Sequence, residues 1–290
     1  MKRHIRLIFL ASFFFSLHMA LLAYVNSSML GQFASANLIS ITYTLASILS
    51  LILVSIAPTI IRRVGNTKYV GISLIASALL LYMISTHSGP SIIPFFILYF
   101  SLNSVVLYGL DLFLEHYSSE SKTGNIRGMY LTLGNVGWVL APVISSAIRT
   151  NFNFKGVYLV ASLSVIATLF VVFIGQKGFV DRIYKKSHFI DGLHILRKKK
   201  DLRNITILNF LLQTYFVIMV IYSPVYLTNI IGFSWKTLGI ILSVMLIPFV
   251  IFPYPAGKLA DKFGEKTLMY VGLLIMAVAT LVFANLGYVS

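Results

Sequence analysis

The sequence predicts an all-α membrane protein, and its composition and long apolar runs support this. Of the 290 residues, 58% are hydrophobic and only 11% are charged, against about 45–50% and about 25% in soluble domains. The mean hydropathy is +0.89. So few charges cannot cover a surface that faces water, which excludes a cytosolic enzyme. So much apolar sequence also excludes a disordered chain.

Apolar runs long enough to cross a bilayer recur along the whole chain. A membrane-spanning helix needs about 20 such residues. We identify nine segments, at roughly 5–25, 35–60, 68–87, 91–116, 126–148, 156–175, 204–228, 236–255 and 267–287. Membrane strands would alternate in polarity, whereas residues 48–54 are apolar except for Ser50. We therefore expect a bundle of about nine transmembrane helices.

The Lys and Arg residues predict the orientation of this bundle. A cytoplasmic N-terminus places all but three of the 23 on the cytoplasmic side, the exceptions being Arg149, Lys155 and Lys236. Loops on that side are enriched in Lys and Arg. We therefore expect a multi-pass protein of the cytoplasmic membrane with its N-terminus inside. The net charge of +15 then belongs to loops and does not indicate nucleic-acid binding.

The longest and most basic connection divides the chain into two parts. It covers residues 176–203, after a six-helix unit at 1–175 and before three helices at 204–290. Its apolar residues are spaced loosely like one face of a helix. We therefore expect a surface helix that lies against anionic lipid headgroups. A lipid-sensing regulatory role is the alternative interpretation.

An internal repeat connects the two parts, because two similar loops each join the second and third helices of their unit. Gly65 and Gly264 occupy equivalent places, 199 residues apart. In the earlier loop, Pro58 and Arg62 precede the glycine. In the later loop, Gly257 begins the sequence GKLADKFGEK, which covers residues 257–266.

The later loop resembles the G-x-x-x-D-[RK]-x-G-x-[RK] loop of the major facilitator superfamily, with Gly257, Asp261, Lys262 and Gly264 at the motif positions. The earlier copy departs from this pattern, because Arg62 stands where the family has Asp. The resemblance implies a secondary transporter with two six-helix halves around a midplane cavity and alternating access between them. A twelve-helix family also implies that this chain is truncated after its ninth helix.

A second motif lies in the fifth predicted helix. Residues Gly137, Ala141, Pro142, Ser145 and Ser146 resemble the G-x-x-x-G-P-x-x-G-G segment of antiporters in the family, with small residues in place of three glycines. Small residues let helix backbones approach closely, and proline kinks a helix. The motif indicates efflux by antiport. Ordinary tight helix packing is the alternative.

Charged residues near the cytoplasmic end of the fourth predicted helix indicate a gate. Asp111 and Glu115 are four residues apart and so share one helix face. We expect them to pair with Arg62, Arg63 or Arg127 and to latch the inward side shut, as the family resemblance also implies. Direct proton binding by Asp111 is the alternative.

His18 is the candidate for proton coupling. It lies about 13 residues into the first predicted helix, about 20 Å from the cytoplasmic end. Ionisable groups inside membranes need a partner or a purpose, and an imidazole titrates near neutral pH. The alternative is a neutral histidine that is hydrogen-bonded to a neighbouring helix.

Polar and aromatic side chains at mid-depth are candidates for a substrate path: Tyr24, Asn26, Tyr43, Asn103, Tyr108, Asn135, Trp138, Asn209, Gln213, Tyr215 and Tyr222. Each could instead form an interhelical hydrogen bond or anchor the chain at the membrane interface. The sequence has no ATP-binding motif, metal-ligand cluster or catalytic serine elbow, so we expect neither a cofactor nor enzymatic activity.

The function that these observations favour is transport of a small solute by a monomer, most simply proton-coupled efflux. Proton-coupled uptake is the second version. A membrane sensor or assembly protein that does not transport, built on the same fold, is the alternative from another class.

Overall fold

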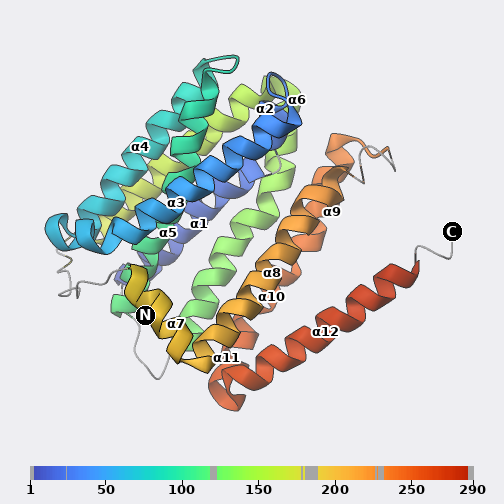
Figure 1. Cartoon of the computed structure of the whole chain (residues 1–290). Helices are drawn as coiled ribbons and strands as arrows, with labels where there is room; N and C mark the ends of the chain where they lie inside the picture. The colour runs from blue at the N-terminus through green and yellow to red at the C-terminus, as the bar shows by residue number, and fades with distance from the viewer. Residues whose placement is uncertain are drawn as a thin grey trace.

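The computed structural model describes residues 3–23, 25–117, 123–177, 179, 189–225, 227 and 232–286. Helices and no strands occur in these ranges, which confirms the predicted all-α fold (Figure 1). The helices are α1 (Arg3–Ala23), α2 (Asn26–Leu30), α3 (Ala36–Val64), α4 (Asn66–Thr86), α5 (Ile92–Tyr117), α6 (Thr123–Gly175), α7 (Phe189–Lys198), α8 (Lys200–Val225), α9 (Trp235–Leu246), α10 (Pro248–Ile251), α11 (Pro253–Phe263) and α12 (Glu265–Leu286).

Six of the described helical stretches are long and apolar enough to cross a membrane. They are α1, α3, α4, α5, the Gly124–Gly175 part of α6 and the Lys236–Phe263 stretch made by α9, α10 and α11. The α6 stretch of 52 residues is about 78 Å long at 1.5 Å per residue, against a hydrocarbon core of about 30 Å. It can therefore account for two crossings. The multi-pass architecture is confirmed, whereas nine spans and a cytoplasmic N-terminus stay predictions.

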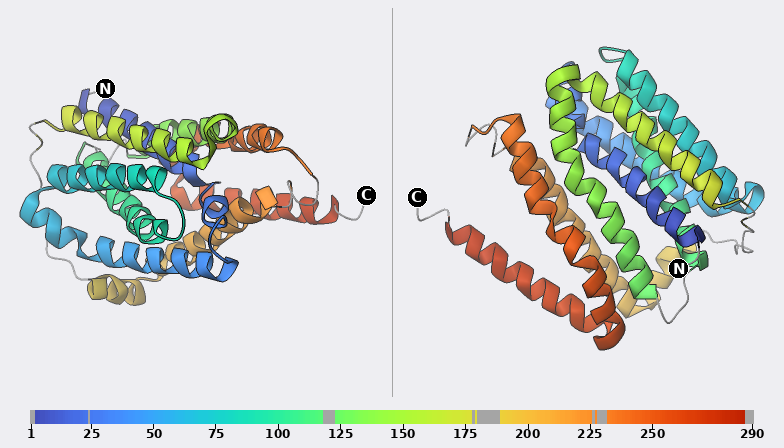
Figure 2. Two further views of the ribbon diagram at one scale, coloured as in Figure 1. Left: turned by 90° about the horizontal axis from the view of Figure 1, so that it is seen from above. Right: turned by 180° about the vertical axis from the view of Figure 1, so that it is seen from behind.

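Helix α6 is bent into two arms at Asn153. The backbone there has φ 58° and ψ −167°, a combination that residues other than glycine rarely adopt. The two arms, residues 123–152 and 154–175, fold back on each other (Figure 2). Across the bend, the Arg149 guanidinium lies 4.7 Å from the centre of the Phe154 ring. The loop expected at 149–155 is therefore a single bend, because polar residues can continue a helix beyond the apolar core.

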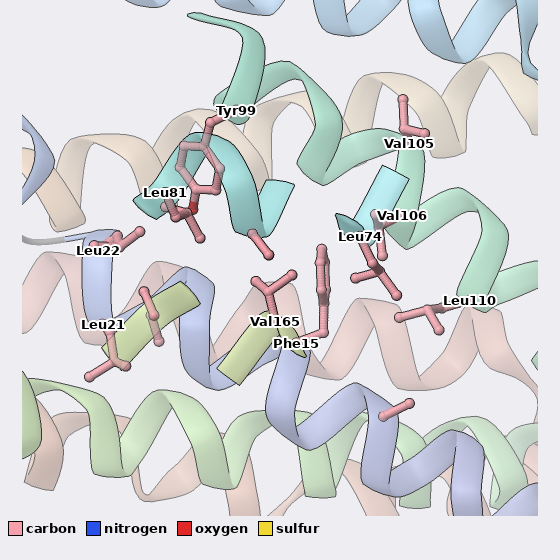
Figure 3. Packing of buried hydrophobic residues seen from close by; sticks show 14 of the residues in the cluster. Phe15, Leu21, Leu22, Leu74, Leu81, Tyr99, Val105, Val106, Leu110 and Val165 are labelled. Carbon is pink, nitrogen blue, oxygen red and sulfur yellow. The ribbon is translucent and has the colours of Figure 1, made fainter. Parts of the chain in front are cut away.

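The first part of the chain forms an N-terminal bundle of α1, α3, α4, α5 and both arms of α6. Its hydrophobic core extends from Ile5 to Val172. Figure 3 shows Phe15 of α1, Leu74 of α4, Tyr99 of α5 and Val165 of α6 within it. All four are at most 1% exposed. The division of the chain into halves at residues 176–203 stays a prediction, since residues 178 and 180–188 lie outside the described ranges.

The stretch from α9 to α11 is a broken helix that we call the α9–α11 arm. A single helix was expected at 236–255, but the arm continues to Phe263 and is interrupted at Ile247 and Phe252. Each interruption directly precedes a proline, Pro248 or Pro253. Both residues keep helical backbone angles, so the interruptions reflect the backbone hydrogen bonds that are lost because proline lacks an amide hydrogen. Helix α12 follows the arm and contacts α11 (Figure 1).

The internal repeat is visible in the backbone of the two loops. Gly65 joins α3 to α4 with φ 85° and ψ 151°, and Gly264 joins α11 to α12 with φ 86° and ψ 144°. The amide of Gly65 donates to the carbonyl of Ile61 at 2.8 Å, and that of Gly264 to Ala260 at 2.9 Å. A positive φ of this size favours glycine. The two glycines therefore form the same one-residue corner between consecutive helices.

Candidate functional site

The candidate functional site is the interface between the first arm of α6 and the α9–α11 arm. These two elements lie side by side in both views of the molecule (Figures 1 and 2), and α6 contacts α9, α10 and α11 in turn. We call this contact the α6/α9–α11 interface. It has a basic end, where Arg127 and Lys262 lie, and an opposite end near Asn153. The interface matters because it joins the N-terminal bundle to the later helices.

At the basic end, glycines bring the two backbones into direct contact. A methyl group added to Gly128 would lie 2.9 Å from the carbonyl oxygen of Pro253, and one added to Gly257 would lie 2.6 Å from that of Gly124. Both distances are too short for carbon and oxygen, so only glycine fits. The carboxylate of Asp261 lies over Gly124, in the first turn of α6. A negative charge is favourable there because of the helix dipole.

In the middle of the interface, one side chain bridges the two elements. The Asn135 side-chain amide donates to the backbone carbonyl of Phe249 at 2.6 Å. In a regular helix that carbonyl would accept from residue 253, but Pro253 has no amide hydrogen. Asn135 therefore supplies the donor that the proline removes. The Phe249 ring also lies 5.6 Å from the ring of Phe216 on α8, so α10 contacts helices on two sides.

At the opposite end, the close approach is repeated with other residues. A methyl group on Gly239 of α9 would lie 3.0 Å from both the Pro142 carbonyl oxygen and the Ser146 hydroxyl. A small cavity of about 20 Å³ adjoins this contact and is lined in part by Ser145 and Arg149. That volume has room for about one water molecule. The interface is therefore tight at both ends and hydrogen-bonded between them.

The residues of the helix-five motif are divided between two neighbours. A methyl group on Gly137 would lie 2.8 Å from the Leu17 amide of α1, so this residue packs against the N-terminal bundle. Pro142 and Ser146 instead face α9. Ala141 is fully buried, and the buried Ser145 hydroxyl donates to the Pro142 carbonyl at 3.2 Å. The motif thus lets one helix approach α1 and α9 at once.

The expected gate residues lie on three helices, α3, α5 and α6. Asp111 interacts favourably with Arg127 and unfavourably with Glu115, and all three are exposed. Arg62 and Arg63 form the exposed last turn of α3. Among the described side chains, no ion pair within 4 Å joins either arginine to Asp111 or Glu115. Nor does a described ion pair within 4 Å join Arg127 to Asp111, although Arg127 is the basic residue whose charge acts on Asp111.

His18 is fully buried inside the N-terminal bundle, away from the α6/α9–α11 interface. Its Nε2 lies 3.2 Å from the Asn103 side-chain oxygen of α5, and its ring packs against Phe15 and Tyr99 at 4.5 and 6.1 Å between centroids. An Nε2–H that donates to Asn103 satisfies this polar atom in an apolar setting. This arrangement suits an interhelical hydrogen bond, and it also isolates an ionisable group from water.

The substrate-path candidates do not meet in one place. Asn103 is bonded to His18, and the Tyr43 hydroxyl lies 3.3 Å from that of Ser27, within the N-terminal bundle. Asn209 and Gln213 are exposed on α8. Partly buried positions are held by Tyr108, Trp138 and Tyr215. Tyr222 lies on α8, and its side chain is outside the described part of the chain, as is Tyr24.

Two features of the interface were not expected from the sequence. The bridge from Asn135 to Phe249 follows from a proline on another helix, and the pair Gly124 and Gly128 follows the small-x-x-x-small spacing of close helix contacts. The glycine spacing and the prolines of the α9–α11 arm are visible in the sequence. What they contact is not.

The chain matches a family model described as Major Facilitator Superfamily over residues 8–289. Members of this family are secondary transporters that move small solutes across membranes. The match covers every element of the interface and the two corner glycines. No curated protein matches the chain significantly.

Proposed function

Because the chain belongs to the major facilitator superfamily and is therefore of the secondary transporter class, we propose that it exports a small solute across the cytoplasmic membrane in exchange for protons. In this proposal the N-terminal bundle and the later helices rock against each other about the α6/α9–α11 interface. Access to the solute then alternates between the two sides of the membrane.

The observation that carries the proposal is the construction of this interface. Backbones approach closely at both ends, through Gly128 and Gly257 at one and Gly239 at the other. Small residues let helix backbones approach closely, so few side chains interlock between the two elements at these places. The central bond from Asn135 to Phe249 lies between the two close contacts, where a rocking motion displaces atoms least.

We place the cytoplasmic gate at the basic end. Asp261 lies over the first turn of α6. Asp111, on α5, interacts electrostatically with Arg127, which lies on the same arm of α6. Both carboxylates therefore act on the beginning of one helix. Opening this end separates each carboxylate from a favourable positive charge. The free energy that this separation costs keeps the gate closed until solute or protons bind.

The direction of transport and the proton carrier are the finer parts of the proposal. Export is supported by the resemblance of the helix-five motif to that of antiporters, since Pro142 and Ser146 lie at the interface. His18 is the candidate carrier, with Asn103 as its partner. Uptake by symport would use the same interface and carrier, with solute and protons moving in one direction.

Paired cysteines can test the rocking joint, because the chain has no native cysteine. We choose Gly128→Cys with Tyr254→Cys at the basic end, and Ser146→Cys with Gly239→Cys at the opposite end. A side chain at Gly128 or Gly239 must displace its neighbours, so transport by each reduced double variant is measured first and is the reference for its own disulfide. Disulfide formation in either pair should stop transport, and reduction should restore it. Transport is measured as gradient-driven solute movement in proteoliposomes that contain the full chain, with a panel of candidate solutes.

The matched control is Ser12→Cys with Gly134→Cys, because these residues also face each other closely but both belong to the N-terminal bundle. Cross-linking them should leave transport unchanged. If both interface pairs form disulfides and transport continues at its full rate, the interface is not the moving joint.

A further inference from the structure

A groove lies on the outside of the N-terminal bundle, between the first turn of α1 and the end of α6. It is lined by Arg3, His4, Leu7, Phe173, Ile174 and Lys177 and has a volume of about 550 Å³. The groove exists because the chain begins beside the place where the second arm of α6 ends (Figure 2). None of its lining residues belongs to the α6/α9–α11 interface.

Three helices hold the walls of the groove in place. His4 Nδ1 donates to the Gly175 carbonyl at 2.6 Å, and the His4 ring stacks on Tyr117 of α5 at 5.4 Å with an angle of 5°. The Tyr117 hydroxyl in turn donates to the side-chain oxygen of the buried Gln176 at 3.3 Å. Gly175 permits the close approach of α1, since a methyl group there would lie 2.9 Å from Leu7. The groove is therefore a formed feature of the bundle.

Along the helix axes, the lining of the groove is positively charged in one turn and apolar in the next. Arg3 and Lys177 are exposed cations, and none of the described residues that line the groove is acidic. Leu7 follows Arg3 by four residues, and Phe173 precedes Lys177 by four, so each apolar side chain lies about one turn deeper than a cation. This order of charge and then apolar surface matches the order of groups in a phospholipid.

We propose that this groove binds an anionic phospholipid, with its phosphate at Arg3 and Lys177 and the start of an acyl chain against Leu7, Phe173 and Ile174. Basic residues close to a membrane surface attract anionic headgroups. Phe173 is 72% exposed and Ile174 53% exposed. These two side chains provide an apolar surface for an acyl chain. A free phosphate ion has no acyl chain and would make no use of this surface. The site does not depend on which solute the protein transports.

The test is lipid retention by the purified full chain, measured by native mass spectrometry after addition of dioleoyl phosphatidylglycerol or dioleoyl phosphatidylcholine. The double variant Arg3→Gln with Lys177→Gln should weaken phosphatidylglycerol binding about 25-fold, since each basic residue contributes roughly a fivefold factor. Phosphatidylcholine, which has no net charge, should bind weakly to both proteins. The charge-matched control Arg62→Gln with Lys68→Gln removes one exposed Arg and one exposed Lys elsewhere and should keep the affinity.

A second variant tests the apolar wall separately. Phe173→Gln should weaken dioleoyl phosphatidylglycerol binding while leaving the response to a dihexanoyl analogue nearly unchanged, because the short chains use less of that wall. The proposal is overturned if both charge variants lose phosphatidylglycerol equally. It is also overturned if phosphatidylcholine binds as tightly, or if inorganic phosphate displaces the lipid at equal concentration, which would identify a simple anion site.

Discussion

Asn135 on α6 hydrogen-bonds to the backbone of Phe249 on α10, with 2.6 Å between the side-chain nitrogen and the carbonyl oxygen. The bond crosses from the N-terminal bundle to the later helices at the place where Pro253 leaves that carbonyl without its helical donor. Within a membrane, no water is at hand to replace a missing donor. The contact between α6 and α10 thus depends on the backbone hydrogen bond that Pro253 removes from the α9–α11 arm.

The first prediction tests this dependence by removing the donor. Asn135→Leu keeps the size of the side chain but leaves the Phe249 carbonyl unpaired. It should lower the free energy of unfolding by about 0.6 kcal/mol, and by about 1.7 kcal/mol at most, as interhelical hydrogen bonds in membranes do. Pro253→Ala restores an amide hydrogen that can donate to the same carbonyl. In that background, Asn135→Leu should have a much smaller effect on the unfolding temperature in detergent. Equal effects in both backgrounds would contradict the explanation.

The second prediction concerns the glycines at the basic end. Gly128→Ala should destabilise the α6/α9–α11 interface, because the added methyl group overlaps the backbone of Pro253. Gly272→Ala on α12 is the control, since its methyl group would meet nothing within 4 Å. Alanine is the better helix former by about 1 kcal/mol, so the control should be neutral or stabilising. The unfolding temperature should fall for Gly128→Ala and stay or rise for Gly272→Ala. A fall or a rise for both variants would exclude a tight contact at Gly128.

The third prediction concerns the latch. Asp111→Asn and Arg127→Gln should each loosen the basic end, and the two effects should not add, because either change removes the same interaction. Exposed pairs contribute about 0.2–1 kcal/mol, so the expected change is small. Glu115→Gln should act in the opposite sense, since it removes a repulsion from Asp111. The measurement is the rate at which a thiol reagent labels Leu112→Cys. If the double variant changes this rate by the sum of the two single effects, Asp111 and Arg127 do not interact.

The fourth prediction concerns His18. If it carries the coupling proton, His18→Gln should abolish solute movement driven by a pH gradient but preserve counterflow exchange, which needs no net proton movement. Gln keeps an amide that can still donate to Asn103, so a purely structural His18 should tolerate this change in both assays. Loss of both activities would instead indicate a defect in folding or solute binding, and a thermal unfolding measurement on the same variant identifies that case.

The sequence predicts the helices well because the bilayer imposes a simple rule of length and polarity. It predicts their ends less well. Helix α3 continues to Val64 and α11 to Phe263, because charged residues such as Arg62 and Lys262 can extend a helix into water. Hydropathy detects only the apolar part of each helix. The matching corners at Gly65 and Gly264 agree with the internal repeat that was expected from the two loops.

The candidate site was less accessible to sequence reasoning. Asp111 and Arg127 come from different helices, and in the sequence several arginines are equally plausible partners for Asp111. Polar residues at mid-depth read alike in sequence, yet His18 and Asn103 lie inside one bundle while Asn209 and Gln213 are exposed on α8. Which face of a helix meets which neighbour depends on the packing of the whole bundle. Periodicity within one segment does not contain this information.

Because α6 is a single helix bent at Asn153, it connects two separate binding regions of the protein. Its first arm forms the α6/α9–α11 interface, and its second arm carries Phe173 and ends beside Lys177 at the lipid groove. No flexible loop separates the arms to absorb a displacement. A lipid that binds more tightly in one transport state therefore biases the equilibrium between states, and by thermodynamic reciprocity the solute changes the affinity for that lipid by the same factor. Transport rates should then depend on the anionic lipid content of the membrane, although none of the residues that line the groove belongs to the α6/α9–α11 interface.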